Sequence, residues 1–293
     1  MERGRIIKAL SGFYYVKSGD KIYRCQGRGV FRNQKISPLV GDFVEFERRD
    51  YEEGYIMRIE PRSTELIRPP IANIDQAIII SSARSPEFSP ILLDRFLVLV
   101  EYKQIQPVIF ITKADLLSDK EKETILHYQK VYKNIGYPVE LLSVKDKDGL
   151  PDLGHYFKGK VTVFAGQSGV GKSSLLNALV PSLTLATNEV SESLGRGKHT
   201  TRHVELIEAF DGLIADTPGF SSLELTEIDP DELTDCFPEM AKRKEQCKFR
   251  GCLHDKEPAC AVKQAVDKEQ IASFRYENYL RFLNEIQNRK PRY

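Results

Sequence analysis

Hydrophobic and polar residues alternate in short runs through the N-terminal part of the chain, as in "GFYYVKSGDKIYRCQGRG" and "GDFVEFERRDYEEGYIMRIE". Alternation with a period of two is typical of strands with one buried face. The runs are separated by Ser-Gly-Asp, Gly-Asp and Glu-Glu-Gly turns. The pattern predicts a small antiparallel barrel over residues 1–68, followed by a linker at the Pro-Pro pair of "RPP".

The pattern changes over residues 69–225, where continuous apolar runs alternate with helix-like stretches. The runs are "QAIIISS", "QPVIFIT", "VELLSV", "VTVFAG" and "GLIAD". The helix-like stretches include "SPILLDRFLVLVEYK" and "SDKEKETILHYQKVYKNIG". Continuous apolar strands between helices predict a mainly parallel sheet covered on both faces, an α/β domain. Residues 226–293 are polar and helical in character, which predicts a third, mainly helical domain.

Composition narrows the classes of protein. The chain has 293 residues with 43 Lys+Arg against 42 Asp+Glu, so no whole-chain field attracts nucleic acid. It has no signal-peptide core, and no apolar run approaches the roughly 20 residues that span a bilayer. Five cysteines are an odd number, which argues against a secreted disulfide framework. We expect a cytoplasmic monomer without a membrane segment.

A phosphate-binding loop is predicted by "GQSGVGKSS", which fits G-x-x-x-x-G-K-[ST] between an apolar strand and a helical stretch. Glycines let backbone amides face phosphate oxygens, and the helix N-terminus adds a favourable dipole. Lys172 is expected to bind the β- and γ-phosphates, and Ser173 to ligate Mg²⁺. The alternative is a glycine-rich turn that binds nothing. The predicted nucleotide-binding residues are Gly166, Gln167, Ser168, Gly169, Val170, Gly171, Lys172, Ser173 and Ser174.

The sequence "DTPG" closes a strand-like run and matches the D-x-x-G motif of GTPases. Asp216 can hold Mg²⁺ through water, and the amide of Gly219 can contact the γ-phosphate. The same four residues also form a good turn with no nucleotide role.

A guanine-reading motif is predicted by "TKAD" in "FITKAD". The carboxylate of Asp115 can accept from both N–H groups on the guanine edge, N1 and N2, whereas adenine offers no such pair. Thr112 is expected to brace the loop, and the stem of Lys113 to lie over the base. Ser143 in "LLSVKD" is a candidate contact to guanine O6, and it is the weakest of these assignments.

The order of these motifs is unusual, because TKAD precedes the phosphate loop instead of following it. Starting an ordinary GTPase after its D-x-x-G strand and joining its old ends produces this order. Natural termini tend to lie close together at the surface, so circular permutation leaves the packed sheet unchanged. The sequence therefore predicts a circularly permuted P-loop GTPase domain.

The residue after D-x-x-G is Phe220, where many GTPases have a Gln that orients the attacking water. "SLGRGKHTTRH", at residues 193–203, is placed where the first switch belongs. His199 is a candidate for orienting the water, and Thr200 or Thr201 a candidate Mg²⁺ ligand. A flexible basic loop with an incidental histidine fits the same residues.

A metal site is predicted by Cys247, Cys252, His254 and Cys260, which lie within 14 residues. Three thiolates and one imidazole complete a tetrahedral Zn²⁺ site and leave no open position, so the zinc would be structural. The alternative is a group of reduced structural cysteines.

Basic and aromatic residues are interleaved between residues 12 and 40, in the predicted barrel. Phosphates can bind the cations and bases can stack on the rings, so this surface is a candidate for RNA binding. The aromatic residues could equally fill the barrel. The residues are Lys17, Lys21, Arg24, Arg28, Arg32 and Lys35 together with Phe13, Tyr14, Tyr15, Tyr23 and Phe31.

From end to end the chain resembles the circularly permuted ribosome small subunit-dependent GTPase A family (RsgA, or YjeQ/YloQ-like). The resemblance rests on the barrel, "TKAD", "GQSGVGKSS", "GRGKHTTRH", "DTPGF" and "CKFRGCLHDKEPAC". It implies an OB-fold first domain, a last domain that binds zinc, and GTP hydrolysis stimulated by the small ribosomal subunit and its rRNA during late maturation of that subunit. It also supports His199 as catalytic.

Two other classes of protein remain open at this stage. One is a P-loop ATPase or nucleotide kinase, for which TKAD is accidental. The other is an RNA-binding scaffold in which GTP is only a structural ligand.

Overall fold

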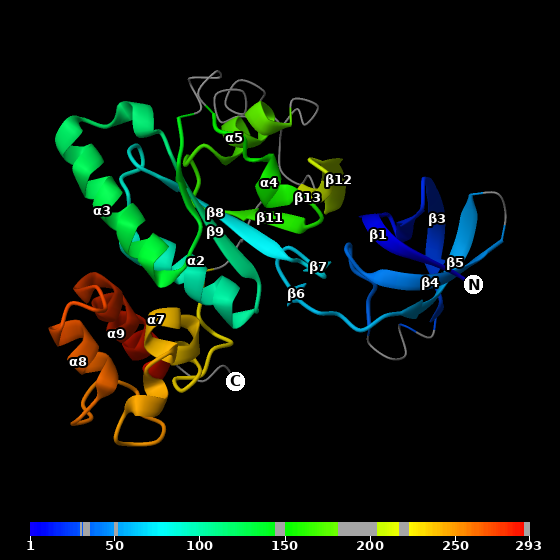
Figure 1. Ribbon diagram of the computed structural model, residues 1–293. Coiled ribbons are helices and arrows are strands. Elements are labelled where there is room, and N and C mark those ends of the chain that lie inside the picture. The colour runs from blue at the N-terminus through cyan, green and yellow to red at the C-terminus, as the bar shows by residue number, and fades with distance from the viewer. Residues whose placement is uncertain are drawn as a thin grey trace. The chain divides into compact units, whose positions relative to one another are not determined.

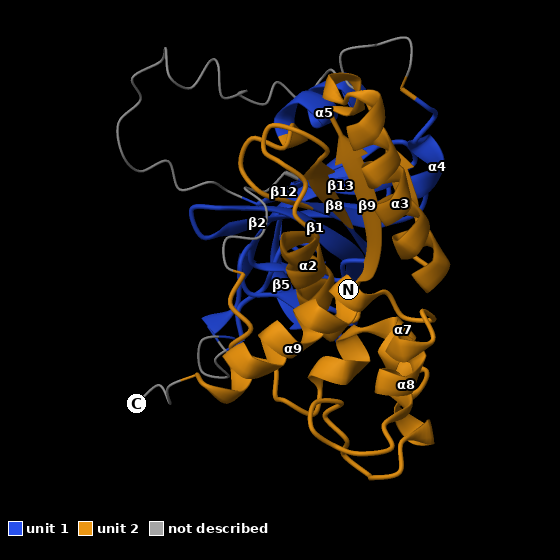
Figure 2. Ribbon diagram, turned by 90° about the vertical axis from the view of Figure 1, so that its left-hand side faces the viewer, with its two compact units in different colours: residues 1–77, 151–164, 173–221 blue, residues 78–150, 165–172, 222–293 orange. Residues whose placement is uncertain are grey.

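The computed structural model describes residues 1–29, 31, 36–49, 52–143, 150–180, 204–216 and 223–289. These residues form two compact units, each made of segments that are separate in sequence (Figure 2). Unit 1 contains residues 1–77, 151–164 and 173–221, and unit 2 contains residues 78–150, 165–172 and 222–293. The boundaries at residues 68 and 225 remain a prediction.

Unit 1 contains the predicted barrel, but the barrel is not wholly antiparallel as predicted, because its third and fifth strands pair in parallel. Strands β1, β2, β3, β5 and β4 pair in that order, and β1 also pairs with β4, which closes the barrel in the manner of an OB-fold. The alternating residues Ile6, Val16, Cys25, Val44, Phe46 and Ile56 fill its interior, each fully buried. The strands are β1 (Glu2–Leu10), β2 (Phe13–Ser18), β3 (Lys21–Gly27), β4 (Phe43–Arg48) and β5 (Glu53–Ile59).

The rest of unit 1 is an extension of the sheet. The strand β12 is antiparallel to β13, and one residue pair, Lys8 with Glu205, joins β12 to β1. Strand β12 was not predicted from the sequence, because it has only five residues and two of them are Glu. The predicted linker is the turn between the short paired strands β6 and β7. The elements are β6 (Glu65–Leu66), β7 (Ile71–Ala72), α4 (Gly154–Phe157), β11 (Val161–Ala165), α5 (Lys172–Leu179), β12 (Glu205–Ala209) and β13 (Gly212–Asp216).

Unit 2 begins with three strands and two helices that match the predicted α/β pattern (Figure 1). The strands are adjacent in the order β10-β9-β8, and β10 is parallel to β9. Ser118 and Glu121 form a capping box that starts α3, and Gly136 ends the helix with φ of 120°. The elements are β8 (Gln76–Ser82), α2 (Pro90–Tyr102), β9 (Gln106–Thr112), η1 (Ala114–Leu116), α3 (Asp119–Ile135) and β10 (Val139–Leu141).

The C-terminal part of unit 2 is helical, as predicted. Its core contains Phe237, Met240, Tyr279 and Phe282, and it also takes in Val98 of α2. One apolar core therefore joins the C-terminal helices to the α/β part of this unit. The elements are η3 (Leu233–Cys236), α7 (Pro238–Ala241), η4 (Lys244–Gln246), α8 (Ala261–Asp267) and α9 (Ser273–Gln287). No helix among the described residues is both long and apolar enough to cross a membrane.

Candidate functional site

The predicted phosphate loop lies in unit 2 directly after β11, and α5 begins at its Lys172. Gly166, Gly169 and Gly171 have φ values of 145°, 81° and 94°, which residues with a Cβ rarely adopt. A Cβ on Gly166 would lie 2.2 Å from the carbonyl oxygen of Ile80. Glycine is therefore required at this position by backbone conformation and by space together.

The side chain of Lys172 lies across the phosphate loop. Its Nζ donates to the carbonyl oxygens of Gly166, at 2.6 Å, and Gln167, at 2.8 Å. Burial lowers the pKa of Lys172 from its usual value. An ammonium group that is half-buried and bonded only to carbonyls can exchange these acceptors for phosphate oxygens, which carry full charge.

The predicted guanine motif is bonded to the phosphate loop through two side chains. The hydroxyl of Thr112, which is fully buried, donates to the carbonyl oxygen of Val170 at 2.5 Å. The Nζ of Lys113 donates to the carbonyl oxygens of Gly169, at 2.7 Å, and Ser85. The fold therefore brings together two motifs that are far apart in the sequence.

Asp115 is exposed in the short helix η1, where its carboxylate is open to a ligand. The hydroxyl of Ser143 donates to Asp115 Oδ1 at 3.1 Å. This bond orients the carboxylate, so Ser143 contacts the residue that was predicted to read guanine. A contact between Ser143 and the base itself stays a prediction.

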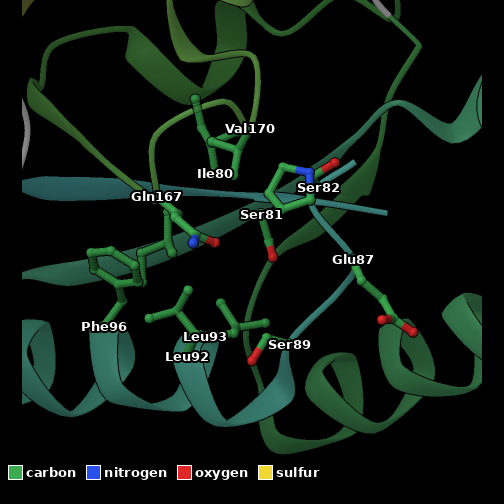
Figure 3. Close-up of a pocket in the computed structure, with 12 residues that line it drawn as sticks. Ile80, Ser81, Ser82, Glu87, Ser89, Leu92, Leu93, Phe96, Gln167 and Val170 are labelled. Atoms are coloured by element: carbon green, nitrogen blue, oxygen red, sulfur yellow. The ribbon is translucent and has the colours of Figure 1, made fainter. Parts of the chain in front are cut away.

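A narrow crevice lies beside the phosphate loop in unit 2. Its walls come from β8, the segment between β8 and α2, and α2, and Gln167 and Val170 close it from the phosphate loop (Figure 3). The segment between β8 and α2, residues 83–89, is called the β8–α2 loop below. It is part of the site, since the Ser85 carbonyl accepts from Lys113.

The β8–α2 loop was not predicted from the sequence. Its signal was the sequence "SARSPEFS", a turn-forming stretch that directly follows an apolar strand.

The other predicted site residues are only partly covered by the described residues. Ser173 and Ser174 lie in α5, and Asp216 is the last residue of β13. The side chain of Asp216, and all of His199, Thr200, Thr201, Gly219 and Phe220, lie outside the described residues.

The four predicted metal ligands converge in the C-terminal part of unit 2. Their ligand atoms all lie within 4.8 Å of one another. His254 Nδ1 is 3.6 Å from Cys247 Sγ and 3.2 Å from Cys260 Sγ, and the two sulfurs are 3.9 Å apart. A zinc tetrahedron has S–S edges of about 3.8 Å and S–N edges of about 3.5 Å, so the donor set fits a zinc ion.

The loop that carries these ligands is fixed on α9. Tyr276 OH donates to the carbonyl oxygen of His254 at 2.7 Å, and Tyr279 OH donates to that of Leu253 at 2.9 Å. The carboxylate of Glu257 accepts from the backbone N–H groups of Leu253 and Asp255. The ligand positions are thus held by hydrogen bonds from the surrounding protein, as is usual around metal ligands.

A closed five-stranded barrel, a phosphate loop bonded to a guanine motif that precedes it, and a helical region with a Cys₃His cluster define a circularly permuted P-loop GTPase with two added regions. The chain belongs to the RsgA GTPase family, whose sequence profile matches residues 59–226, while the profile of the RsgA N-terminal domain matches residues 3–56. The chain is accordingly a GTP hydrolase.

Curated relatives match the whole chain. It is 66% identical over 293 residues to "Small ribosomal subunit biogenesis GTPase RsgA 2" of Oceanobacillus iheyensis, with 100% of both chains covered. It is 59% identical over 298 residues to "Small ribosomal subunit biogenesis GTPase RsgA" of Bacillus subtilis, again with 100% of both covered.

Two solved structures share the fold. YloQ, described as a circularly permuted GTPase, has a TM-score of 0.86 and 54% identity, covering 100% of this chain and 97% of its own. YjeQ from Thermotoga maritima has a TM-score of 0.87 and 36% identity, covering 99% of both chains. Circular permutation is therefore also described for YloQ.

Proposed function

We propose that this chain binds the small ribosomal subunit, assists its late maturation, and leaves after hydrolysing GTP to GDP and phosphate. The observation that carries the proposal is the bonding of Thr112 and Lys113 to the phosphate loop, which places the predicted guanine motif beside the predicted phosphate site. The relatives named as small ribosomal subunit biogenesis GTPases support the choice of partner.

Within this site we assign the guanine edge to Asp115, oriented by Ser143, and the base face to the stem of Lys113. The loop from Gly166 to Ser174 would hold the phosphates. Mg²⁺ bound with GTP would neutralise phosphate charge, held by Ser173, by Asp216 through water, and by Thr200 or Thr201. Gly219 would contact the γ-phosphate, and His199 would orient the attacking water in place of the missing Gln.

For the C-terminal part we propose one structural zinc ion. Four protein ligands leave no position for substrate, so Cys247, Cys252, His254 and Cys260 would stabilise the fold of this region without taking part in hydrolysis. Binding of the ion and folding of the ligand loop would then be coupled.

The outer regions are proposed to contact rRNA. In the barrel the exposed guanidinium of Arg24 lies over the half-buried ring of Phe13 at 4.9 Å and is paired with Glu53, whereas the ring of Tyr23 is buried in the barrel. A guanidinium held on a half-buried ring places a phosphate-binding group next to a ring on which a base could stack, which suits single-stranded RNA. We further propose domains at residues 1–68, 69–225 and 226–293, and a monomer that acts in the cytoplasm.

The test is GTP hydrolysis measured with and without purified small subunits. We expect small subunits to raise turnover by well over tenfold, because contacts with the subunit would position the groups that orient the attacking water. Purified large subunits are the partner control and should not stimulate. Hydrolysis that is equally fast without subunits would contradict the proposal, and absence of turnover in every condition would favour a scaffold that holds GTP as a structural ligand.

The proposed role of His199 is tested in the same assay. His199→Ala should abolish most of the stimulation while GTP affinity and subunit binding stay nearly intact. His203→Ala, the same substitution a few residues away, is the matched control and should keep full stimulation. Full stimulated turnover in the His199 variant would mean that another group positions the water.

A further inference from the structure

The β8–α2 loop connects the guanine motif to the helices of unit 2. The carbonyl of Ser85 accepts from Lys113 Nζ, and Arg84 NH1 donates to the carbonyl oxygen of Leu116, in the turn that carries Asp115, at 2.9 Å. A Cβ placed on Gly169 would lie 3.9 Å from Pro86, so the loop also borders the phosphate loop. Any displacement of this loop therefore moves the acceptor that fixes Lys113.

The loop is supported from outside by a row of aromatic rings. The ring of Phe88 packs on Tyr128 of α3 with centroids 5.1 Å apart. Tyr128 in turn meets Phe274 of α9 edge to face at 5.2 Å, and Phe274 meets Tyr132 at 6.0 Å. The C-terminal helix α9 thus reaches the nucleotide-side loop through α3, within a single compact unit (Figure 2).

Helix α9 is itself held by buried charges next to Phe274. Arg275 is fully buried and donates to Asp94 of α2 at 2.6 Å and to Glu239 of α7 at 2.7 Å. Tyr132 OH and Asn278 Nδ2 donate to the same Asp94 carboxylate, at 2.6 and 2.7 Å. Because every one of these groups is paired, α9 cannot shift without leaving a buried charge unsatisfied. Phe274 therefore presents a fixed surface to Tyr128.

We propose that Phe274 is a positioning residue for guanine-nucleotide binding: through Tyr128 and Phe88 it holds the β8–α2 loop, and through that loop the Lys113 that contacts the base. The C-terminal region, beyond its proposed contacts to rRNA, then sets how long the nucleotide stays bound. A docking partner that breaks the Arg275 contacts, and so tilts α9, speeds nucleotide release. The inference rests on the proposed guanine site.

The test is the dissociation rate of fluorescent mant-GDP from the full chain, measured by stopped flow. An edge-to-face pair is worth roughly 2- to 10-fold in an equilibrium constant, so Phe274→Ala should speed dissociation by about that factor. Phe249→Ala is the matched control, because this ring belongs to the same C-terminal region, is 44% exposed, and contacts Lys248 instead of α3. The Phe249→Ala variant should release mant-GDP at the rate of the parent chain.

A double-mutant cycle separates positioning from general loss of stability. Phe88→Ala and Phe274→Ala act through the same contacts, so the double variant should release mant-GDP no faster than the faster single variant. If the effects of the two substitutions on the dissociation rate multiply, or if Phe274→Ala releases mant-GDP at the rate of the parent chain, the proposal is overturned. Phe274→Leu keeps most of the side-chain volume and is the control for unfolding. Its rate of mant-GDP dissociation should lie between those of the parent chain and Phe274→Ala. Failure of the parent chain to bind mant-GDP would instead refute the guanine site itself.

Discussion

Arg275 offers the sharpest test of how unit 2 is held together. Its guanidinium is fully buried between the carboxylates of Asp94 and Glu239, with three charge-assisted hydrogen bonds to them. The substitution Arg275→Met removes the positive charge and all three donors. It keeps an unbranched apolar stem to fill the space beside Phe237, whose ring lies 4.5 Å from the guanidinium carbon.

The expected cost follows from the two carboxylates that remain. Removing one partner of a buried pair leaves an uncompensated charge and costs about 3–5 kcal/mol. Burial raises the pKa of Asp94, while Arg275 acts in the opposite direction and lowers it. Without Arg275 the pKa of Asp94 rises further, and the variant can reduce the cost only by binding a proton.

The sign of the pH dependence follows from this shift. A carboxyl whose pKa is higher in the folded state stabilises the fold below its unfolded pKa of about 3.9, and this contribution is lost as pH rises through the folded pKa. Because the folded pKa is higher still in Arg275→Met, the variant loses more stability than the parent as pH rises above about 4. The difference between them should be largest at neutral and alkaline pH and shrink on acidification.

Hydrogen–deuterium exchange of α9 peptides measures opening of this region alone, without assuming that the whole chain unfolds in one step. A loss of 3 kcal/mol corresponds to exchange faster by about 150-fold. The control is Arg281→Met, the same substitution at an exposed position of the same helix. Exchange in Arg275→Met within a few-fold of the parent at neutral pH would refute the reasoning, because it would mean that the buried carboxylates do not need the cation.

Three further predictions concern the nucleotide and metal sites. Asp115→Asn should weaken GTP binding severely and shift preference towards xanthosine triphosphate, whose C2 carries an acceptor; unchanged GTP affinity in a competition assay would remove the guanine assignment. Elemental analysis should find about one zinc per chain, and Cys252→Ala should lose it and loosen the C-terminal region while nucleotide still binds; a metal-free, fully folded parent chain would end that assignment. Gly166→Ala should weaken mant-GDP binding by about tenfold or more, since its Cβ meets the Ile80 carbonyl, whereas Gly29→Ala, with nothing within 4 Å, should not; equal affinities in a titration would argue against the close approach.

The site could be predicted where its chemistry depends on local spacing. A phosphate loop needs glycines, a lysine and a serine at set intervals, so Gly166–Ser173 can be recognised from the sequence alone. The metal cluster is also local, because Cys247, Cys252, His254 and Cys260 lie within 14 residues. The alternation of apolar and polar residues in β1 to β5 and the apolar run of β9 can also be recognised in the sequence, because the periodicity of a strand depends on consecutive residues.

Other features carried little or no local signal. Strand β12 was missed because its five residues are too few to show a clear alternation, and its place depends on pairing with β13 and β1. The β8–α2 loop has an ordinary turn sequence, and its place in the site depends on the hydrogen bond that the Ser85 carbonyl accepts from Lys113. Asp94, inside the apolar stretch "ILLDRFLVLV", was a visible anomaly, but its partner lies on α9, 181 residues away.

The sequence by itself predicted the set of chemical groups: a loop for phosphates, a carboxylate proposed to bind guanine, three thiols with an imidazole, and an order of motifs that a permuted GTPase explains. These follow from residue type and spacing, which are properties of neighbouring positions. Only the tertiary structure decided that Thr112 and Lys113 bond to the phosphate loop and that Arg275 joins α9 to α2. Such contacts depend on how separate segments pack, because a buried donor or charge must find its partner in space, and nothing in the local sequence specifies which partner that is.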